Sequence, residues 1–507
     1  MKKTLLSVLL AATLLSAAPR KPKLVLAITI DQFRYDYLTR FRSEYHGGFD
    51  RLLTKGAVFT NANYIHFPTI TAVGHSTYLS GATPSMSGII GNEWWDRDEK
   101  KRVTSVSDPT TKLLGGTGDG GSPRRMLVST VGDELKMANG SKSRVIGISL
   151  KDRAAILPAG HMADGAYWFD LKAQNFVSST YYFKDLPGWV KDFNSSRPGD
   201  KYSGAKWLNH TLPTDLAKLY GDNTNSPLEE SPFGNELVLQ LALRALTAEQ
   251  LGSRGVTDLL AVSFSSNDKV GHDFGTYSPE EHDVTIQTDE MLERLFQAID
   301  KQLGLDNVLV VLTGDHGVSP SAEEMAAHRM PGGRMPGNTI RNAVQAALTA
   351  KYGEGAYVAG SMDLSIFLNE DTLAKKNLDI VEVRRVAAET AIKIPHILRV
   401  YTRDQIQSGQ VAADSIGRRM MNSFNQRRGP DIQFIPEPYW TVSDSVATHG
   451  SPFIYDSHVP VIFMGSGVKP GRYDVSVAIN DIAPTLATIL DVETPAGSVG
   501  RVLTEIW

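Results

Sequence analysis

Cysteine is absent from this chain of 507 residues. The protein therefore forms no disulfide bond, and it has no thiolate that could act as a nucleophile or as a metal ligand. Any metal site in the chain must be built from histidine and carboxylate side chains.

An excess of basic charge is also missing. The chain has 52 Lys and Arg against 56 Asp and Glu, so nothing in its composition indicates a nucleic-acid-binding surface. Long apolar runs are missing too, because no segment after the N-terminus is long enough to span a membrane as a helix. The hydrophobic content of 41% is that of an ordinary globular protein. The length suits one large α/β domain with insertions, or two to three smaller units.

The N-terminus has the three parts of a secretory signal. Met1-Lys2-Lys3 is basic, Leu5 to Leu15 is apolar, and Ser16-Ala17-Ala18 offers small residues for cleavage. We expect residues 1–18 to be a signal peptide and the mature protein to be periplasmic or secreted. An uncleaved membrane anchor is the alternative, which the short apolar run disfavours.

Five apolar runs are typical of strands that are covered on both faces of a sheet. They occupy residues 24–30, 144–150, 257–264, 307–313 and 459–464. Helical patterns separate them, within residues 34–56, 126–138, 235–250 and 284–303, and a last helix opens near residue 481. This alternation predicts an α/β fold with a mostly parallel central sheet and helices on both faces.

Two long stretches interrupt the alternation. Residues 162–235 are rich in aromatic side chains, and we interpret them as an insertion that covers a site. An irregular part of the same core is the alternative. Residues 320–440 mix helical and strand patterns, which indicates a small appended subdomain. We therefore expect one domain over residues 19–507 with these two insertions.

Charged side chains follow four of the expected strands. They are Asp31, Lys151 with Arg153, Asp268 with His272, and Asp315 with His316. Any one of them could be a helix cap or part of a turn. In open α/β sheets, however, ligands bind outside the carboxyl ends of the strands. The repetition at successive strand ends therefore favours a functional site.

The histidines and carboxylates suit two metal ions. Asp268 and His272 are four residues apart, so they share a face of a helical turn, and His449 could add a third ligand. Asp31, Asp315 and His316 could hold a second ion together with Thr71. Such mixed ligands suit Zn²⁺, although Mn²⁺ or Fe remain possible. Two ions roughly 3.5–4 Å apart can stabilise the attacking and leaving oxygens of a phosphoryl displacement.

Thr71 lies in a short loop that runs into a helix. A helix start suits an anion, but threonine there is usually an ordinary cap. Binding to a metal would lower the pKa of the Thr71 hydroxyl and make it a nucleophile. Lys151 and Arg153 are two residues apart and would point the same way on an extended segment, where they suit phosphate oxygens. The amide of Asn92 could donate to the same oxygens.

Taken together, these residues resemble the alkaline phosphatase superfamily. They are most similar to its secreted phosphomonoesterases with a threonine nucleophile, the PafA-like alkaline phosphatases of bacteria. The matching stretches are Thr71-Ala72-Val73-Gly74-His75, Gly88-Ile89-Ile90-Gly91-Asn92-Glu93-Trp94, Ser149-Leu150-Lys151-Asp152-Arg153, Asp268-Lys269-Val270-Gly271-His272, Gly314-Asp315-His316-Gly317 and Thr448-His449-Gly450. They follow the family's order over most of the chain, which is more specific than any single motif.

The resemblance implies an alkaline-phosphatase-like fold and two Zn²⁺ ions per chain. The implied ligands are Asp268, His272 and His449 for one ion, and Asp31, Asp315, His316 and Thr71 for the other. Thr71 would attack phosphorus and carry the phosphoryl group, which water would then hydrolyse. Asn92, Lys151 and Arg153 would hold the phosphoryl oxygens. The implied substrates are small-molecule phosphate monoesters, and we expect a monomer.

One residue departs from the family pattern. Val73 stands where the family often has proline before the Gly-His pair, a change of loop shape that leaves the assignment intact. Thr69 is a second hydroxyl nearby, but only Thr71 has the family's spacing to Gly74-His75. We expect the remaining His75, His161 and His458 to support the structure.

Other functions compete with this interpretation. A phosphodiesterase of the nucleotide pyrophosphatase type would share both zinc sites and the nucleophile. Lys151 and Arg153 argue against a diesterase. Two cations can bind the extra charged oxygen of a monoester dianion, whereas a diester has an alkyl group at that position. A catalytically silent zinc- or phosphate-binding protein is disfavoured by the complete ligand set. A sulfatase is disfavoured because its usual nucleophile derives from cysteine.

Overall fold

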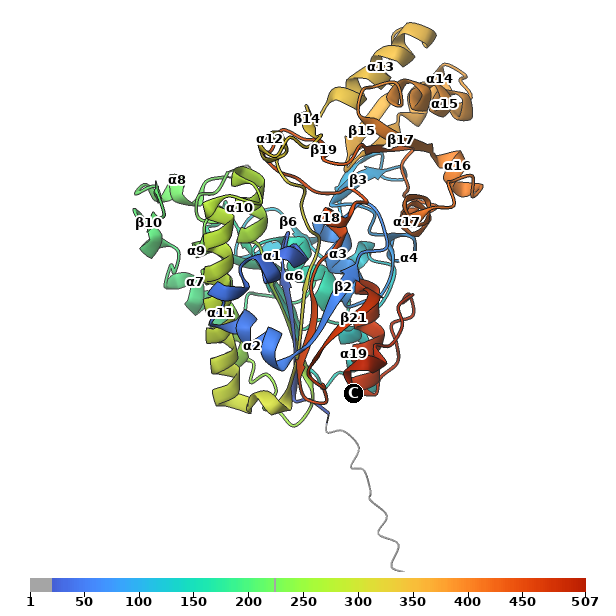
Figure 1. Ribbon diagram of the computed structural model, residues 1–507. Helices are drawn as coiled ribbons and strands as arrows, with labels where there is room; N and C mark the ends of the chain where they lie inside the picture. The colour runs from blue at the N-terminus through green and yellow to red at the C-terminus, as the bar shows by residue number, and fades with distance from the viewer. Residues whose placement is uncertain (1–20, 223–224) are drawn as a thin grey trace, which may run out of the picture.

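The computed structural model describes residues 21–222 and 225–507 (Figure 1). These residues form a large α/β body around an 11-stranded sheet, and a smaller unit with a four-stranded sheet lies at one end of it. The expected signal peptide lies outside the described residues. Over the described part of the chain, no helix combines the length and apolar character needed to cross a bilayer.

The large sheet is parallel at its centre and mixed at its edges. Its strands are β1 (Leu24–Ile30), β2 (Ala57–Asn63), β5 (Ser107–Leu114), β6 (Asp119–Gly121), β7 (Val145–Ser149), β8 (Gly165–Asp170), β9 (Asn175–Ser179), β12 (Asp258–Phe264), β13 (Val308–Gly314), β20 (Val461–Gly465) and β21 (Gly471–Ala478). Their order is β21-β2-β20-β13-β1-β12-β7-β8-β9-β5-β6. The neighbours from β13 to β8 are all parallel, whereas β20 and β9 pair antiparallel with this centre.

The predicted α/β fold with a central sheet is confirmed. All five predicted strands are present, as β1, β7, β12, β13 and β20, and their ends lie within two residues of the prediction. At the edge with β8 and β9 the sheet differs from a parallel one because the short connection between these two strands can only return the chain antiparallel. The parallel centre is the part that places the functional residues.

Alternate residues of the central strands face two layers of helices. Leu24, Leu26 and Ile28 of β1 are fully buried in one core, while Val25 and Ala27 are fully buried in another. The first core contains α2 (Gly48–Lys55), α9 (Pro232–Ala248) and α11 (Pro279–Leu303). The second contains α3 (Thr71–Tyr78), α5 (Val131–Ala138) and α19 (Ile482–Leu490). Figure 1 shows α9 and α11 on one side of the sheet and α3 and α19 on the other.

Residues 162–235 differ from the expected insertion at their start. β8 and β9 belong to the central sheet, so residues 165–179 are part of the main body. Aromatic rings that follow also pack inward: the ring centroids of Tyr167 and Trp189 lie 5.2 Å apart, and those of Tyr202 and Phe233 lie 4.4 Å apart. The aromatic content of this stretch therefore reflects core packing.

Residues 320–440 contain a second sheet with its own core. Its order is β15-β16-β18-β17, and every neighbouring pair is antiparallel. The strands are β15 (Val358–Met362), β16 (Ser365–Leu368), β17 (Ile397–Thr402) and β18 (Ile432–Pro436), and the main helices are α13 (Thr339–Tyr352) and α15 (Ile380–Ala391). Buried Ile340, Val344, Ile366 and Val383 belong to one cluster. We call this unit the subdomain.

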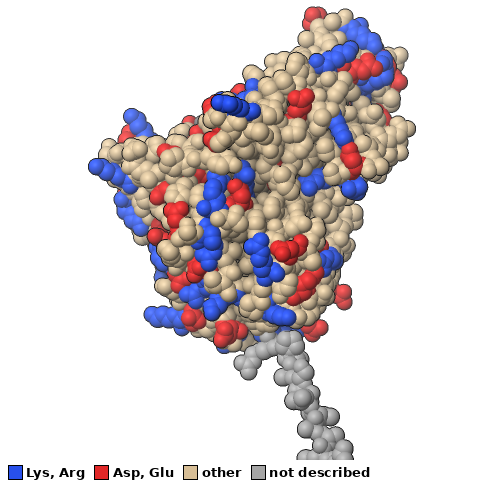
Figure 2. All heavy atoms as spheres, viewed as in Figure 1, with Lys and Arg blue, Asp and Glu red and all other residues tan. Residues whose placement is uncertain are grey.

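The surface carries both signs of charge. On the face drawn in Figure 2, acidic and basic side chains are interspersed over the body and the subdomain. This arrangement agrees with the nearly balanced composition of 52 basic and 56 acidic residues. The functional residues therefore depend on local geometry rather than on a field of one sign over this face.

Candidate active site

The parallel centre of the sheet brings the predicted side chains together. Asp31 follows β1, Asp315 follows β13, and Lys151 follows β7 after one intervening residue. Asp268 lies on α10 (Ser266–Phe274), directly after β12. Because β13, β1, β12 and β7 are neighbours and parallel, their carboxyl ends lie at one edge of the sheet. The convergence follows from topology alone.

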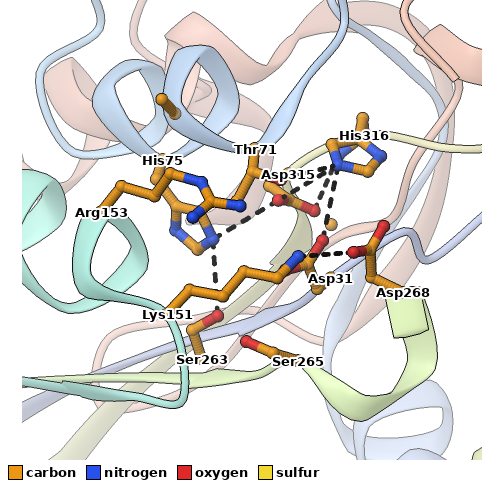
Figure 3. Close-up of polar contacts among 12 residues, drawn as sticks. Asp31, Thr71, His75, Lys151, Arg153, Ser263, Ser265, Asp268, Asp315 and His316 are labelled. Atoms are coloured by element: carbon orange, nitrogen blue, oxygen red, sulfur yellow. Dashed lines mark hydrogen bonds and ion pairs between the residues drawn. The ribbon is translucent and has the colours of Figure 1, made fainter. Parts of the chain in front are cut away.

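Thr71 is the first residue of helix α3. Ile70 occupies the N-cap position, so the Thr71 hydroxyl is not the cap of this helix. The side chain is buried, and its Oγ1 lies 3.4 Å from Nε2 of His316. Figure 3 shows Thr71 above Asp315, with the guanidinium of Arg153 on one side and His316 on the other. The hydroxyl thus faces the charged cluster.

Asp268, His272 and His449 form the first expected ligand set. Nε2 of His272 lies 3.2 Å from Oδ1 of Asp268, and Nε2 of His449 lies 3.6 Å from the same oxygen. Asp268 and His272 share one face of α10, as their spacing predicted. The three candidate ligand atoms lie within 4.8 Å of one another, a geometry that can hold one metal ion.

Asp31, Asp315 and His316 form the second expected set. Nε2 of His316 lies 3.4 Å from Oδ1 of Asp31 and 3.5 Å from Oδ2 of Asp315. All three side chains are fully buried. Two overlapping groups in this region also have the spacing of a metal site, Asp31 with His75 and Asp315, and Asp31 with Asp268 and His316. The two sets are therefore continuous.

The three histidines of the expected ligand sets are anchored in the same way. Each Nδ1 bonds to a backbone carbonyl, in the pairs His272–Ala447 (2.8 Å), His316–Gly317 (2.9 Å) and His449–Thr69 (2.9 Å). A carbonyl oxygen only accepts, so Nδ1 carries the proton and donates it. The lone pair of each Nε2 is then directed at the carboxylates. Metal-binding histidines in proteins are oriented by such bonds.

The buried carboxylates also fit a bound cation. Among the described residues, Asp31 Oδ1 and Asp315 Oδ2 are buried and accept no hydrogen bond. Burial raises the pKa of Asp31, and burial together with the nearby Asp31 raises the pKa of Asp315 well above its usual range. Burial lowers the pKa of His316 to about 3, which keeps this ring neutral and able to ligate. A neutral imidazole beside crowded carboxylates suits the donor set of a divalent metal site.

Lys151 lies between the two ligand sets. Its Nζ is 2.6 Å from Oδ2 of Asp31 and 2.5 Å from Oδ2 of Asp268. Burial acts to lower the pKa of Lys151, but the charges of Asp268 and Asp31 outweigh it and raise this pKa overall. The charged ammonium therefore offsets two buried carboxylates in this structure. Its contact with phosphoryl oxygens remains a prediction.

The expected extended segment at Lys151 to Arg153 is wrong. Lys151 is the N-cap of α6 (Asp152–Ala159), and Arg153 already lies in the first turn of this helix. The helix begins here because Asp152 favours a first turn. Arg153 nevertheless reaches the site, because its Nε donates to Oδ1 of Asn92 over 3.0 Å. Its position comes from the helix and from Asn92, and not from strand alternation.

Asn92 connects three parts of the site. Its Oδ1 accepts from Arg153 and also from the backbone N–H of Ala72 in α3, over 2.9 Å. Its own backbone N–H donates to Oδ2 of Asp363, over 3.1 Å. Since the carbonyl oxygen of the side chain is used twice, its amide group is the part left to donate to a ligand oxygen.

Gln32 and His75 also belong to the site. The sequence predicted no role for Gln32 and only a structural role for His75. Gln32 donates from its backbone N–H to Asp315 Oδ1 (3.1 Å) and from Nε2 to Asp268 Oδ1 (2.8 Å), so it bridges the two ligand sets. Only its place directly after Asp31 could have indicated it. His75 was expected to support the structure, but its Nε2 lies 3.4 Å from Asp315 Oδ2. Its spacing of four residues from Thr71 on α3 was the available sign.

Other candidates lie away from this chemistry. The hydroxyl of Thr69 donates to the carbonyl of Ser451 over 2.8 Å, which directs it elsewhere. Nε2 of His458 bonds to the carbonyl of Thr60 over 2.9 Å, and its ring stacks on that of Tyr35. The backbone carbonyl of His161 accepts from the hydroxyl of Tyr181. These residues hold local structure.

A cleft of about 230 Å³ leads to the site. Asn92 and His449 line it from the main body, while Asp363, Leu364 and Trp440 line it from the subdomain side. The subdomain therefore forms one wall of the entrance. A ligand that reaches Thr71 through this cleft passes between the two units.

Sequence comparison defines the class of protein. Residues 25–456 match the type I phosphodiesterase / nucleotide pyrophosphatase family. The chain belongs to this family, within the alkaline phosphatase superfamily.

Two relatives and one crystal structure place the chain further. It is 37% identical over 542 residues to alkaline phosphatase PafA of Elizabethkingia meningoseptica, an alignment that covers 100% of this chain and 99% of the relative. It is 36% identical to alkaline phosphatase PhoV of Synechococcus elongatus, with 96% and 93% covered. The fold matches the crystal structure of wild-type PafA with a TM-score of 0.90 at 36% identity, over 96% of this chain and 99% of that one. The family predicted from the motifs is confirmed.

Proposed function

We propose that the protein is an alkaline phosphatase that hydrolyses phosphate monoesters through a phosphothreonine at Thr71. One observation carries the proposal: the buried Thr71 hydroxyl, at the start of α3, lies 3.4 Å from His316 and faces Arg153. A hydroxyl set among metal-type ligands and a phosphate-binding cation suits phosphoryl transfer. The names of the full-length relatives support the same activity.

The first step is a displacement at phosphorus. Oγ1 of Thr71 loses its proton to solvent and forms the new P–O bond, while the bond from phosphorus to the leaving oxygen breaks. The leaving oxygen keeps the electron pair of that bond and takes a proton from solvent, so the product departs as an alcohol. Arg153 offers a planar guanidinium to two phosphoryl oxygens, and the Asn92 amide can donate to one of them. Asn92 holds Arg153 in place through its carbonyl oxygen. These groups stabilise the charge that develops on the transferred group.

Two Zn²⁺ ions would complete the site, held by Asp268, His272 and His449 and by Asp31, Asp315, His316 and Thr71. When bound, they would offset the buried carboxylates, lower the pKa of the Thr71 hydroxyl and stabilise the attacking and leaving oxygens. Gln32 would orient Asp268 and Asp315 for this purpose by donating to both.

The second step frees the enzyme. A water molecule attacks the phosphorus of the phosphothreonine from the side that the alcohol left. The P–O bond to Thr71 breaks, inorganic phosphate leaves, and the Thr71 hydroxyl regains a proton. We further propose that the enzyme acts in the periplasm or outside the cell, as its N-terminal sequence indicates, and that it is a monomer.

Monoester and diester substrates test the proposed activity. We expect kcat/KM for an aryl phosphate to exceed that for its methyl diester by roughly a hundredfold, because Lys151 and Arg153 suit an extra charged oxygen. Arg153→Ala should lower turnover of the monoester more than that of the diester. The family also contains diesterases. A wild-type preference for the diester would replace our proposal with the phosphodiesterase alternative.

A further inference from the structure

The tip of one subdomain hairpin reaches the active site. β15 and β16 pair antiparallel with Met362 opposite Ser365, so Asp363 and Leu364 form a two-residue turn. Both lie in the left-handed region of the backbone, at φ 47° and 61°. Turns of this type usually contain Asn-Gly, because few other residues adopt positive φ without cost. Here the sequence keeps Asp-Leu, and a branched side chain such as that of Leu364 adopts this conformation only with strain.

The side chain at this tip explains what the strained turn achieves. Oδ2 of Asp363 accepts the backbone N–H of Asn92 over 3.1 Å, and Asp363 also lines the active-site cleft. Burial raises the pKa of Asp363 to about 7, and the Asn92 N–H and the Arg153 charge act against that rise. A half-buried carboxyl at the edge of the cleft thus contacts Asn92, the residue that holds the substrate-binding arginine.

The main body is shaped to receive this carboxyl. A Cβ at Gly91 would lie 2.7 Å from Oδ2 of Asp363, closer than real Cβ contacts allow. Glycine at position 91 therefore permits the approach. On the subdomain side, the carbonyl of Leu364 accepts the N–H of Phe434, which ties the turn to the subdomain sheet. The contact is built from both units.

We propose that Asp363 is a positioning residue for substrate binding, through which the subdomain becomes part of the active site. It fixes the backbone of Asn92, whose Oδ1 accepts from Arg153 and from Ala72 at the start of α3. One subdomain carboxyl thereby sets the place of the arginine and of the helix that carries Thr71. The inference rests on the proposed function, because it assigns Asn92 and Arg153 to phosphoryl binding.

Two variants separate the effect of the hydrogen bond from that of the strained turn. Asp363→Gly removes the acceptor but suits a positive φ, so backbone strain cannot explain a loss. Asp363→Asn keeps an acceptor oxygen and also tolerates this conformation. We expect Asp363→Gly to lower kcat/KM for an aryl phosphate by roughly ten- to hundredfold, the cost of misplacing a binding group. Asp363→Asn should retain most of the activity. In Asp363→Gly, kcat/KM for the methyl diester should fall less than kcat/KM for the monoester.

The dependence on Asn92 is the decisive measurement. In the Asn92→Ala background, Asp363→Gly should cause little further loss, because the two residues act as one unit. Equal losses in both backgrounds, or wild-type activity in Asp363→Gly, would overturn the inference. Unchanged activity in Asn92→Ala would instead contradict the proposed function itself. Thermal unfolding of each variant with bound metal checks that it is folded.

Discussion

Thr71 lies one residue past the position of a simple helix cap. Ile70 is the N-cap of α3, and the Thr71 hydroxyl is turned to His316. Its chemistry is therefore set by its neighbours in space, His316, Asp315 and Arg153, rather than by its helix. The same holds for His75, one turn further along, which meets Asp315 from the same face of α3.

Removal of the Thr71 hydroxyl should abolish the covalent intermediate. We expect Thr71→Ala to lose roughly a thousandfold or more in kcat, since loss of a nucleophile has effects of this size in other hydrolases. Acid-quenched enzyme that has been mixed with a phosphate monoester should gain the mass of one phosphoryl group in the wild type and none in this variant. Thr71→Ser, which keeps a hydroxyl, is the control and should still be labelled. Label retained in Thr71→Ala would place the nucleophile elsewhere.

At the level of single residues, the sequence predicted the side chains that converge at the sheet edge better than the residues that support them. Asp31, Asp268 and His272 could be recognised because each follows an apolar run in a short motif. Gln32 and Asp363 carry no comparable pattern. Gln32 donates hydrogen bonds to Asp315 and Asp268, which follow the two strands on either side of β1. Asp363 lies far along the chain in another unit. Neither contact has a local cause that a sequence can display.

Helix α3 must approach the end of β13 very closely to place Thr71. A Cβ at Gly74 would lie 2.0 Å from the backbone oxygen of Asp315, so only glycine allows this packing. The glycine in Thr71-Ala72-Val73-Gly74-His75 thus has a structural reason. The close packing holds α3 and the end of β13 together as one rigid part of the site.

Gly74→Ala should therefore damage both stability and catalysis. The added methyl group meets backbone atoms that cannot rotate away, which typically costs about 1–3 kcal/mol. We expect a lower midpoint in urea unfolding and a lower kcat as α3 shifts from Asp315. Gly188→Ala is a matched control, because Gly188 is the first residue of α7 (Gly188–Ser195) and a Cβ there would meet nothing within 4 Å. Equal effects of the two substitutions would contradict the close-approach argument.

At the level of elements, buried strands were easier to predict than the rest. β1, β12 and β13 are continuous apolar runs because helices cover both of their faces. β8 and β9 were hidden in an aromatic stretch without clear alternation. The helix of Arg153 was mistaken for an extended segment because its first residues, Asp152 and Arg153, are polar and follow a strand directly. Helix starts of this kind depend on tertiary packing more than on local pattern.

The whole molecule joins two separately packed units around one cleft. The main body supplies the ligand sets, Thr71 and Arg153, and the subdomain adds Asp363 and Trp440 to the entrance. Ion pairs cross between the units, including that of Arg97 with the buried Asp431. The site thus depends on how the two units are assembled, and not only on the central sheet.

Metal removal should affect the molecule as a whole. Without bound cations, Asp31, Asp315 and Asp268 repel one another in a buried site, so chelation should lower the melting temperature by several degrees and abolish turnover. Adding Zn²⁺ back should restore both, and elemental analysis should find two metal ions per active chain. An Asp268→Asn variant should bind less metal and show a smaller effect of chelator on its melting temperature. A chelator-treated enzyme that is metal-free and fully active would contradict the two-metal site.

The residue types and apolar runs of the sequence were enough to predict the central architecture and the kind of chemistry. Without cysteine, the reactive groups had to be hydroxyl, imidazole, carboxylate and cationic side chains, and apolar runs that end in such groups predicted their convergence at one sheet edge. The folded structure was needed to show that Gln32 donates to both Asp268 and Asp315, and that Asp363 reaches Asn92 from the subdomain. The physical reason is distance along the chain. Periodicity records which face of an element is buried, whereas contacts between remote segments arise only when the packed units meet.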